Sequence, residues 1–166
     1  MKKIILLLFA VALPLMSQAQ FKFGYFSYDE ALRSMPEYSV AQANMKDLRR
    51  KYDAETKRVE EEFNRKYEEF LDGQRDFAPT ILQKRQTELQ DLLNKNVAFK
   101  AEAEKLLAKA EVEAFAPLRE KLANVVAQIG AEKGYAFVLN TDGDACPYIN
   151  PEMGEDISQI VMEALQ

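Results

Sequence analysis

Two stripes of apolar residues run along the middle of this chain and mirror each other about one short break. Apolar residues recur every three or four positions over residues 45–71 and again over 81–110, which is the spacing of one face of a helix. The two stripes pair with a nearly constant sum of residue numbers, as antiparallel helices require: Leu71 with Ile81, Phe63 with Leu89, Val59 with Leu93, Tyr52 with Phe99, Leu48 with Ala103, and Met45 with Leu107. The pattern predicts a long antiparallel helical hairpin.

Capping and turn residues predict where both helices begin and end. Residues 34–37, Ser-Met-Pro-Glu, combine the spacing of a helix cap with a proline in the first turn, so the first helix is predicted to begin there. Gly73 and Pro79 bracket the tip, and the second helix is predicted to run onward to near Gly130. Each stripe is narrow, which is typical of a coiled-coil seam rather than of a globular bundle.

The segments on either side of the hairpin are predicted to form a small α+β body. Their turn signals, aromatic content and capping spacings predict short elements. These elements are a strand at 21–26, a short helix capped by Ser27, strands at 135–139 and 145–150 joined by a turn at 142–144, and an amphipathic helix after Asp156. Three short strands and small helices bury little apolar area, so the body is expected to need oligomerisation.

Pro117 lies inside the second helix and falls nearly opposite Pro36 in the hairpin register. A proline removes an amide donor and clashes with the preceding turn, so it is expected to kink or interrupt the helix. We interpret Pro36 and Pro117 as a hinge where the arm leaves the body. The fold class predicted is mainly α with a small β component. Its domains are a discontinuous body at 21–36 and 117–166 and a coiled-coil arm at 37–116, with its tip near 73–80.

The first twenty residues have the pattern of a cleaved signal peptide. Lys2 and Lys3 precede a short apolar run at 4–15, and small residues around Ala19 suit cleavage. The alternative is a membrane helix, but the run is too short to cross a bilayer core of about 30 Å. We therefore expect an exported, periplasmic chain with no transmembrane segment in its mature part.

Composition narrows the function further. Without Lys2 and Lys3 the chain keeps 20 basic and 27 acidic residues, which argues against a nucleic-acid partner. There is no histidine, which removes the commonest general base. Cys146 is the only cysteine, so neither a disulfide within the chain nor a zinc cluster can form. The glycines are isolated rather than grouped in a phosphate-binding loop. We expect no catalytic residue, no metal and no cofactor.

Several short segments together resemble the Skp/OmpH family of periplasmic chaperones. The resemblance covers the mature chain in order, and the following segments carry it: Phe23-Gly24-Tyr25, Met35-Pro36-Glu37-Tyr38, Ala116-Pro117-Leu118, residues 134–139 (Gly-Tyr-Ala-Phe-Val-Leu) and Asp156-Ile157-Ser158. The resemblance implies a jellyfish-like homotrimer that holds unfolded outer-membrane proteins between its arms without ATP. The best-known members are strongly basic whereas this chain is acidic, so no lipopolysaccharide site is carried over.

Aromatic residues are the candidate contacts for such clients. Phe63, Tyr67, Phe70 and Phe77 are the candidates, because a wall of apolar side chains can hold an unfolded chain by many weak contacts. For Phe63, as for Tyr52 and Phe99, we favour a seam position over client contact. Phe70 and Phe77 lie at the tip, where both interpretations stay open. The trimer implied by the resemblance would have its core on the strands of the body, at Phe23, Tyr25, Tyr135, Phe137 and Leu139.

The segment 142–144 and the coiled coil each allow a second interpretation. Asp142-Gly143-Asp144 resembles part of a calcium loop, but the further oxygen ligands are missing and a hairpin turn is favoured. For function, the alternative to a chaperone is a structural or adaptor coiled coil of the cell envelope, which would bind a folded partner and ignore unfolded chains.

Overall fold

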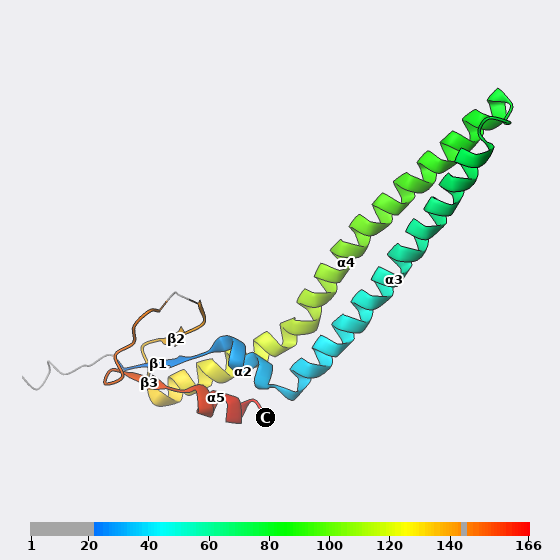
Figure 1. Ribbon diagram of the computed structural model, residues 1–166. Coiled ribbons are helices and arrows are strands. Elements are labelled where there is room, and N and C mark those ends of the chain that lie inside the picture. Colours follow the sequence, from blue (N-terminus) through cyan, green and yellow to red (C-terminus); the bar gives the residue numbers. More distant parts are fainter. Residues whose placement is uncertain (1–21, 144–145) are drawn as a thin grey trace, which may run out of the picture. The chain divides into compact units, whose positions relative to one another are not determined.

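The computed structural model describes residues 22–143 and 146–166, and in this part the chain is mainly helical with a small parallel sheet (Figure 1). The predicted signal peptide lies outside the described residues. The elements in chain order are β1 (Phe23–Phe26), α2 (Tyr28–Ser34), α3 (Pro36–Gly73), α4 (Pro79–Lys133), β2 (Val138–Asn140), β3 (Gly154–Asp156) and α5 (Ser158–Ala164).

The chain divides into two compact units. We call residues 37–117 the helical unit, and we call residues 22–36 together with 118–166 the mixed unit. The boundaries between them fall directly after Pro36 and Pro117, the two residues interpreted as a hinge. Helix α4 continues through Pro117, so of the two expected effects of this proline, a kink or an interruption, the interruption does not occur.

The long helices begin and end close to their predicted limits. Helix α3 begins at Pro36 and ends at Gly73, and α4 begins at Pro79. Helix α4 ends at Lys133, three residues beyond the predicted Gly130. Gly134 supplies the end, because its φ of 66° lies in the left-handed region that lets a glycine terminate a helix.

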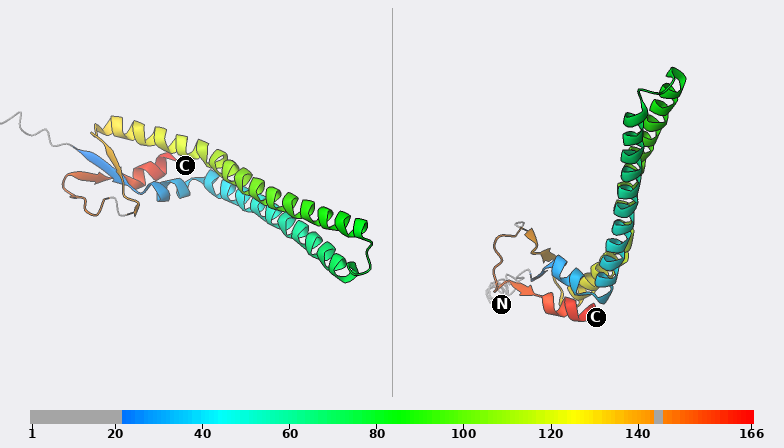
Figure 2. Two further views of the ribbon diagram at one scale, coloured as in Figure 1. Left: turned by 90° about the horizontal axis from the view of Figure 1, so that it is seen from above. Right: turned by 45° about the vertical axis from the view of Figure 1, so that its right-hand side comes forward.

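Within the helical unit, α3 and the first part of α4 lie side by side and run in opposite directions (Figures 1 and 2). The rings of Tyr52 and Phe99 lie 6.4 Å apart, which matches the predicted pairing, and Tyr38 and Phe115 lie 5.3 Å apart. Helix α3 has no fully buried residue. In α4 the buried residues of this unit are Ala103 and Leu107, so most of the seam is only half-covered.

The mixed unit contains a three-stranded sheet in the order β2-β1-β3, with both outer strands parallel to β1. The predicted hairpin after the long helix is therefore wrong, since β2 and β3 flank β1 instead of pairing with each other. Of the predicted strand at 145–150, the described residues 146–150 are irregular. The third strand is Gly154–Asp156, and no periodic pattern in the sequence predicted it.

Hydrogen bonds accepted by the Asp142 carboxylate hold this segment against another part of the chain instead of letting it turn back as a hairpin. The Asp142 carboxylate accepts bonds from the Ser27 hydroxyl at 2.6 Å and from the Asp29 amide at 2.8 Å. Ser27 in turn accepts from the Glu30 amide, as the capping spacing predicted. Donation from Ser27 is the main cause that lowers the pKa of Asp142. The segment after β2 is thus tied to the start of α2.

The core of the mixed unit lies on one face of the sheet. Its members come from every helix of the unit: Phe26, Ala31, Leu32, Met35, Leu118, Leu122, Ile129, Ile157, Val161 and Leu165. Gly24 faces the same way, because a Cβ built there would lie about 3.0 Å from the Tyr135 ring and 3.2 Å from Ile157. Since side chains alternate along a strand, Phe23 and Tyr25 project from the opposite face.

Candidate functional site

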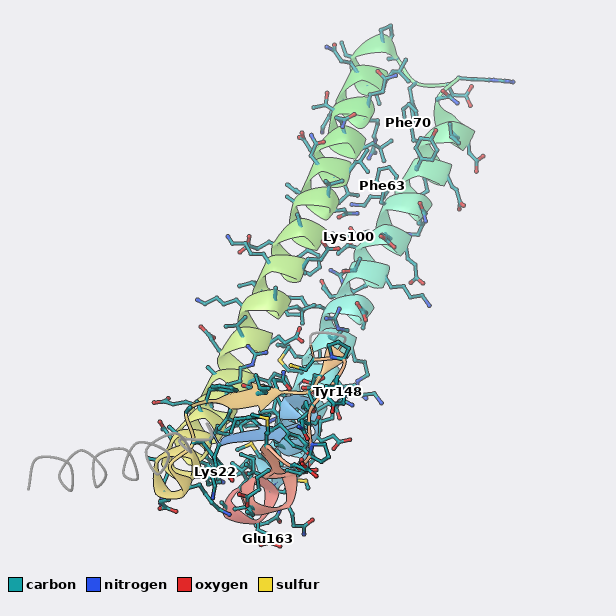
Figure 3. All side chains as sticks on the ribbon, turned by 90° about the vertical axis from the view of Figure 1, so that its left-hand side faces the viewer. Lys22, Phe63, Phe70, Lys100, Tyr148 and Glu163 are labelled. Carbon is teal, nitrogen blue, oxygen red and sulfur yellow. The ribbon has the colours of Figure 1, made fainter. Side chains whose placement is uncertain are left out.

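A shallow groove runs between the two helices of the helical unit. Its volume is about 330 Å³, and α3 and α4 both contribute to it: Thr56, Val59, Glu60, Phe63, Asn64, Leu93, Asn96, Val97 and Lys100 line it. Phe63 projects from α3 toward α4, and Lys100 lies on the α4 side (Figure 3). Thr56, Val59, Phe63 and Asn96 are the half-buried residues of the lining, and the others are exposed. The groove therefore offers both apolar and polar or charged side chains.

Exposed apolar residues continue this surface along the helices. Phe63 stacks on Tyr67 with ring centroids 5.9 Å apart, and Leu71 follows one further turn along α3. Tyr67 is 45% exposed, Leu71 42%, Leu93 40% and Val97 62%. We call the surface formed by Phe63, Tyr67, Leu71, Leu93 and Val97 the apolar face.

Charged side chains gather on the other side of the seam, where they pair with one another. Arg58 bonds both Glu55 and Glu62, and Glu62 also accepts from Lys66 at 3.1 Å. The hydrogen bond from Lys66 is the main cause that lowers the pKa of Glu62. On α4, Arg85 pairs with Glu88 at 3.4 Å. These pairs are exposed to solvent, so each stabilises the unit little, but together they keep this side polar.

The tip holds a second aromatic pair. Phe70 and Phe77 pack with ring centroids 6.3 Å apart, and a Cβ added at Gly73 would lie 2.7 Å from the Phe77 ring. Both rings are only half-exposed, and they line a hollow of about 390 Å³ together with Lys66, Glu69, Arg85, Glu88 and Leu89. Phe70 and Phe77 thus close the end of the helix pair, and one side of each ring remains open to the hollow.

The predicted assembly residues separate onto two faces of the sheet. Phe23 stacks on Phe137 at 5.3 Å, and Phe137 is 50% exposed. Tyr25 and Leu139 are register partners, so they share that outer face. Tyr135 instead packs against Gly24 on the covered face. Four of the five predicted assembly residues therefore lie on the outer face of the sheet.

The hydroxyl of Tyr135 donates a 2.5 Å hydrogen bond to Glu155, which also pairs with Lys133 at 2.6 Å. Burial, followed by the bond to Glu155, raises the pKa of Tyr135 to about 12. Tyr135 therefore has a structural task inside its own chain, joining the end of α4 to β3.

Sequence reasoning missed Leu93 and Val97 as surface residues. Leu93 was assigned to the seam, and Val97 falls outside the mirrored pairs. The signal was present, because a narrow seam cannot cover apolar residues that lie beside it on the helix surface, as Leu93 and Val97 do. Among the described residues, no cluster of His, Cys, Asp or Glu could hold a metal ion, and none of the described helices is long and apolar enough to cross a membrane.

The fold and these two surfaces define a mainly helical protein built from a long helix pair and a small mixed unit. The chain matches the family of OmpH-like outer membrane proteins over residues 22–165, and it belongs to that family. It is also similar to the crystal structure of a proposed outer membrane chaperone (OmpH-like) from Caulobacter crescentus CB15. The TM-score is 0.71 at 19% identity, over 90% of this chain and 86% of that one. A comparison with curated proteins found no match.

Asn96 provides a test of how the helix pair holds its register. Its amide donates a 2.9 Å hydrogen bond to the Val59 carbonyl across the seam, whereas Asn94 bonds only Gln90 on its own helix. We expect Asn96→Ala to lower the free energy of unfolding by about 1 kcal/mol more than Asn94→Ala. The gain in helix propensity is equal in both variants and cancels. Urea denaturation measures the difference, and equal midpoints would show that the cross-seam bond contributes nothing.

Proposed function

We propose that this protein is an ATP-independent periplasmic holdase chaperone. It would bind unfolded outer-membrane proteins against its helical arms and prevent them from aggregating. The observation that carries the proposal is the apolar face, an exposed apolar surface on a helix pair whose other side carries exposed ion pairs. The family, the similarity to a proposed outer membrane chaperone and the predicted signal peptide support the same conclusion.

Weak contacts suit this task. Each exposed side chain of the apolar face contributes only about 1–2 kcal/mol when a client covers it, so a single arm binds loosely. Several arms in one oligomer raise the effective concentration of binding surface without new contacts. A client held in this way can leave without ATP once it folds elsewhere.

The aggregation of a denatured outer-membrane barrel protein tests the proposal. The mature protein, mixed with this client on dilution from urea, is expected to suppress light scattering in proportion to its concentration. A folded coiled-coil protein of similar length and charge serves as the control. If scattering is unchanged at a molar excess, the holdase proposal fails. Capture of a folded envelope protein in the same conditions would then favour an adaptor.

We further propose that three copies assemble through the outer face of the sheet. Parallel sheets are normally covered on both faces, yet Phe23, Tyr25, Phe137 and Leu139 lie on a face that its own chain covers only in part. The homotrimer is the assembly that the family resemblance implies. Burying these aromatic rings would supply the apolar area that the small mixed unit cannot bury alone.

Substitution of Phe137 tests this assembly. Phe137→Glu places a charge where the proposed interface would be dry, so the trimer is expected to dissociate to monomers. Tyr148→Glu is the matched control, because Tyr148 is 79% exposed and belongs to the same unit. Light scattering coupled to gel filtration gives the mass. A trimer that survives Phe137→Glu would place the interface elsewhere.

Pro36 and Pro117 are proposed as the hinge of the arm. Pro117 cannot donate the backbone hydrogen bond of an interior helical residue, and the unit boundary follows it directly. Pro117→Ala restores that bond and is expected to narrow the range of arm positions. Spin labels at Arg75→Cys and Glu132→Cys, in a Cys146→Ala background, would report the distance distribution. An unchanged width would remove Pro117 from the hinge.

A further inference from the structure

The apolar face is one-sided, and its pattern points to the kind of chain it can hold. Phe63, Tyr67 and Leu71 lie on α3 at intervals of four residues, which is a repeat of about 6 Å along the helix axis. Leu93 and Val97 repeat at the same interval on α4. Alternate side chains of an extended strand recur every 6.6–6.8 Å or so. The two repeats agree to within about 1 Å.

The apolar area of the face is small for a stable folded partner. The exposed parts of Tyr67, Leu71, Leu93 and Val97 amount to roughly 400 Å². A stable protein–protein interface needs about 800 Å² from each partner. The face alone therefore supplies about half of the area that a second copy of the chain or a folded protein would need, whereas it is large enough to contact a short chain segment along its length.

The cost of ordering the segment favours an extended one. The surface from Thr56 to Leu71 is about 22 Å long, which an extended strand spans with about seven residues and a helix with about fifteen. Conformational entropy is lost for every residue that is fixed, so the helix would lose roughly twice as much for the same contact length. An isolated helix of that length is also only marginally stable in water.

The polar side chains of the groove suit the backbone of an extended segment. Such a segment presents N–H and C=O groups that need hydrogen-bond partners. Thr56, Asn64, Glu60 and Lys100 supply both donors and acceptors there. Among the described residues, neither Glu60 nor Lys100 forms an ion pair with another side chain, so both are free to bond a client.

We propose that the apolar face binds extended segments in which apolar and polar residues alternate. This inference rests on the proposed holdase function and names the feature of the client that is recognised. Alternation places apolar side chains on the face at the repeat of the helix turns and leaves polar side chains in water. Strands of outer-membrane barrels alternate in this way, so the pattern would select them from unfolded chains of equal mean hydropathy.

Two fluorescent, uncharged peptides of about nine residues and identical composition test the inference. In one peptide apolar and polar residues alternate, and in the other the apolar residues recur at helical spacing. Fluorescence anisotropy with the mature protein is expected to show binding of the alternating peptide about tenfold tighter than binding of the other. Equal binding, tighter binding of the helical peptide, or binding of neither would each overturn the inference.

A matched pair of variants locates the surface. Val97→Glu places a charge on the apolar face and is expected to weaken binding of the alternating peptide about tenfold. Val112→Glu is the control, because Val112 is 60% exposed on the same helix and lies about 22 Å away along its axis. Equal losses in the two variants would show that binding does not depend on this face.

The aggregation assay distinguishes a failure of the alternation rule from a failure of the holdase proposal. A protein that suppresses aggregation but does not distinguish the peptides would remain a holdase, and the alternation rule would be wrong. A protein that does not suppress aggregation would end the holdase proposal whatever the peptides show.

Discussion

A pair of helices can cover only one stripe of each helix, and much of this protein depends on that constraint. Helix α3 runs for 38 residues without one fully buried side chain. Its seam residues contact α4 on one side and water on the other. Any apolar residue that lies beside the seam on the helix surface, such as Tyr67 or Val97, therefore remains exposed. In a globular bundle a third helix would cover such residues.

The other side of the helical unit from the apolar face carries charged residues that pair with one another. The network of Arg58, Glu55, Glu62 and Lys66 is solvent-exposed, and the pKa of both glutamates is lowered because neighbouring cations donate hydrogen bonds to them. Such pairs contribute little to stability individually. Their larger effect is to keep this side of the helix pair well hydrated.

The mixed unit also has apolar side chains that its own chain covers only in part. Its core residues, such as Leu122 and Ile157, pack on one face of a sheet with strands of only three or four residues. The other face presents Phe23 and Phe137 with half of the Phe137 side chain in water. In both units the apolar surface that one chain cannot cover is the surface proposed to contact another chain.

The sequence by itself determined the long helices and their break, because helical periodicity and the signals of Gly73 and Pro79 act over a few neighbouring residues. The cap of the short helix α2 by Ser27 was local in the same way. The sequence also placed the pairing of Tyr52 with Phe99 correctly. It did not determine the sheet order. The segment after β2 is held by Asp142 through a bond to Ser27, 115 residues earlier, and β3 has only three residues with no periodic pattern. Which face of the helix pair is apolar was likewise decided by tertiary structure, because exposure beside a seam depends on both helices at once.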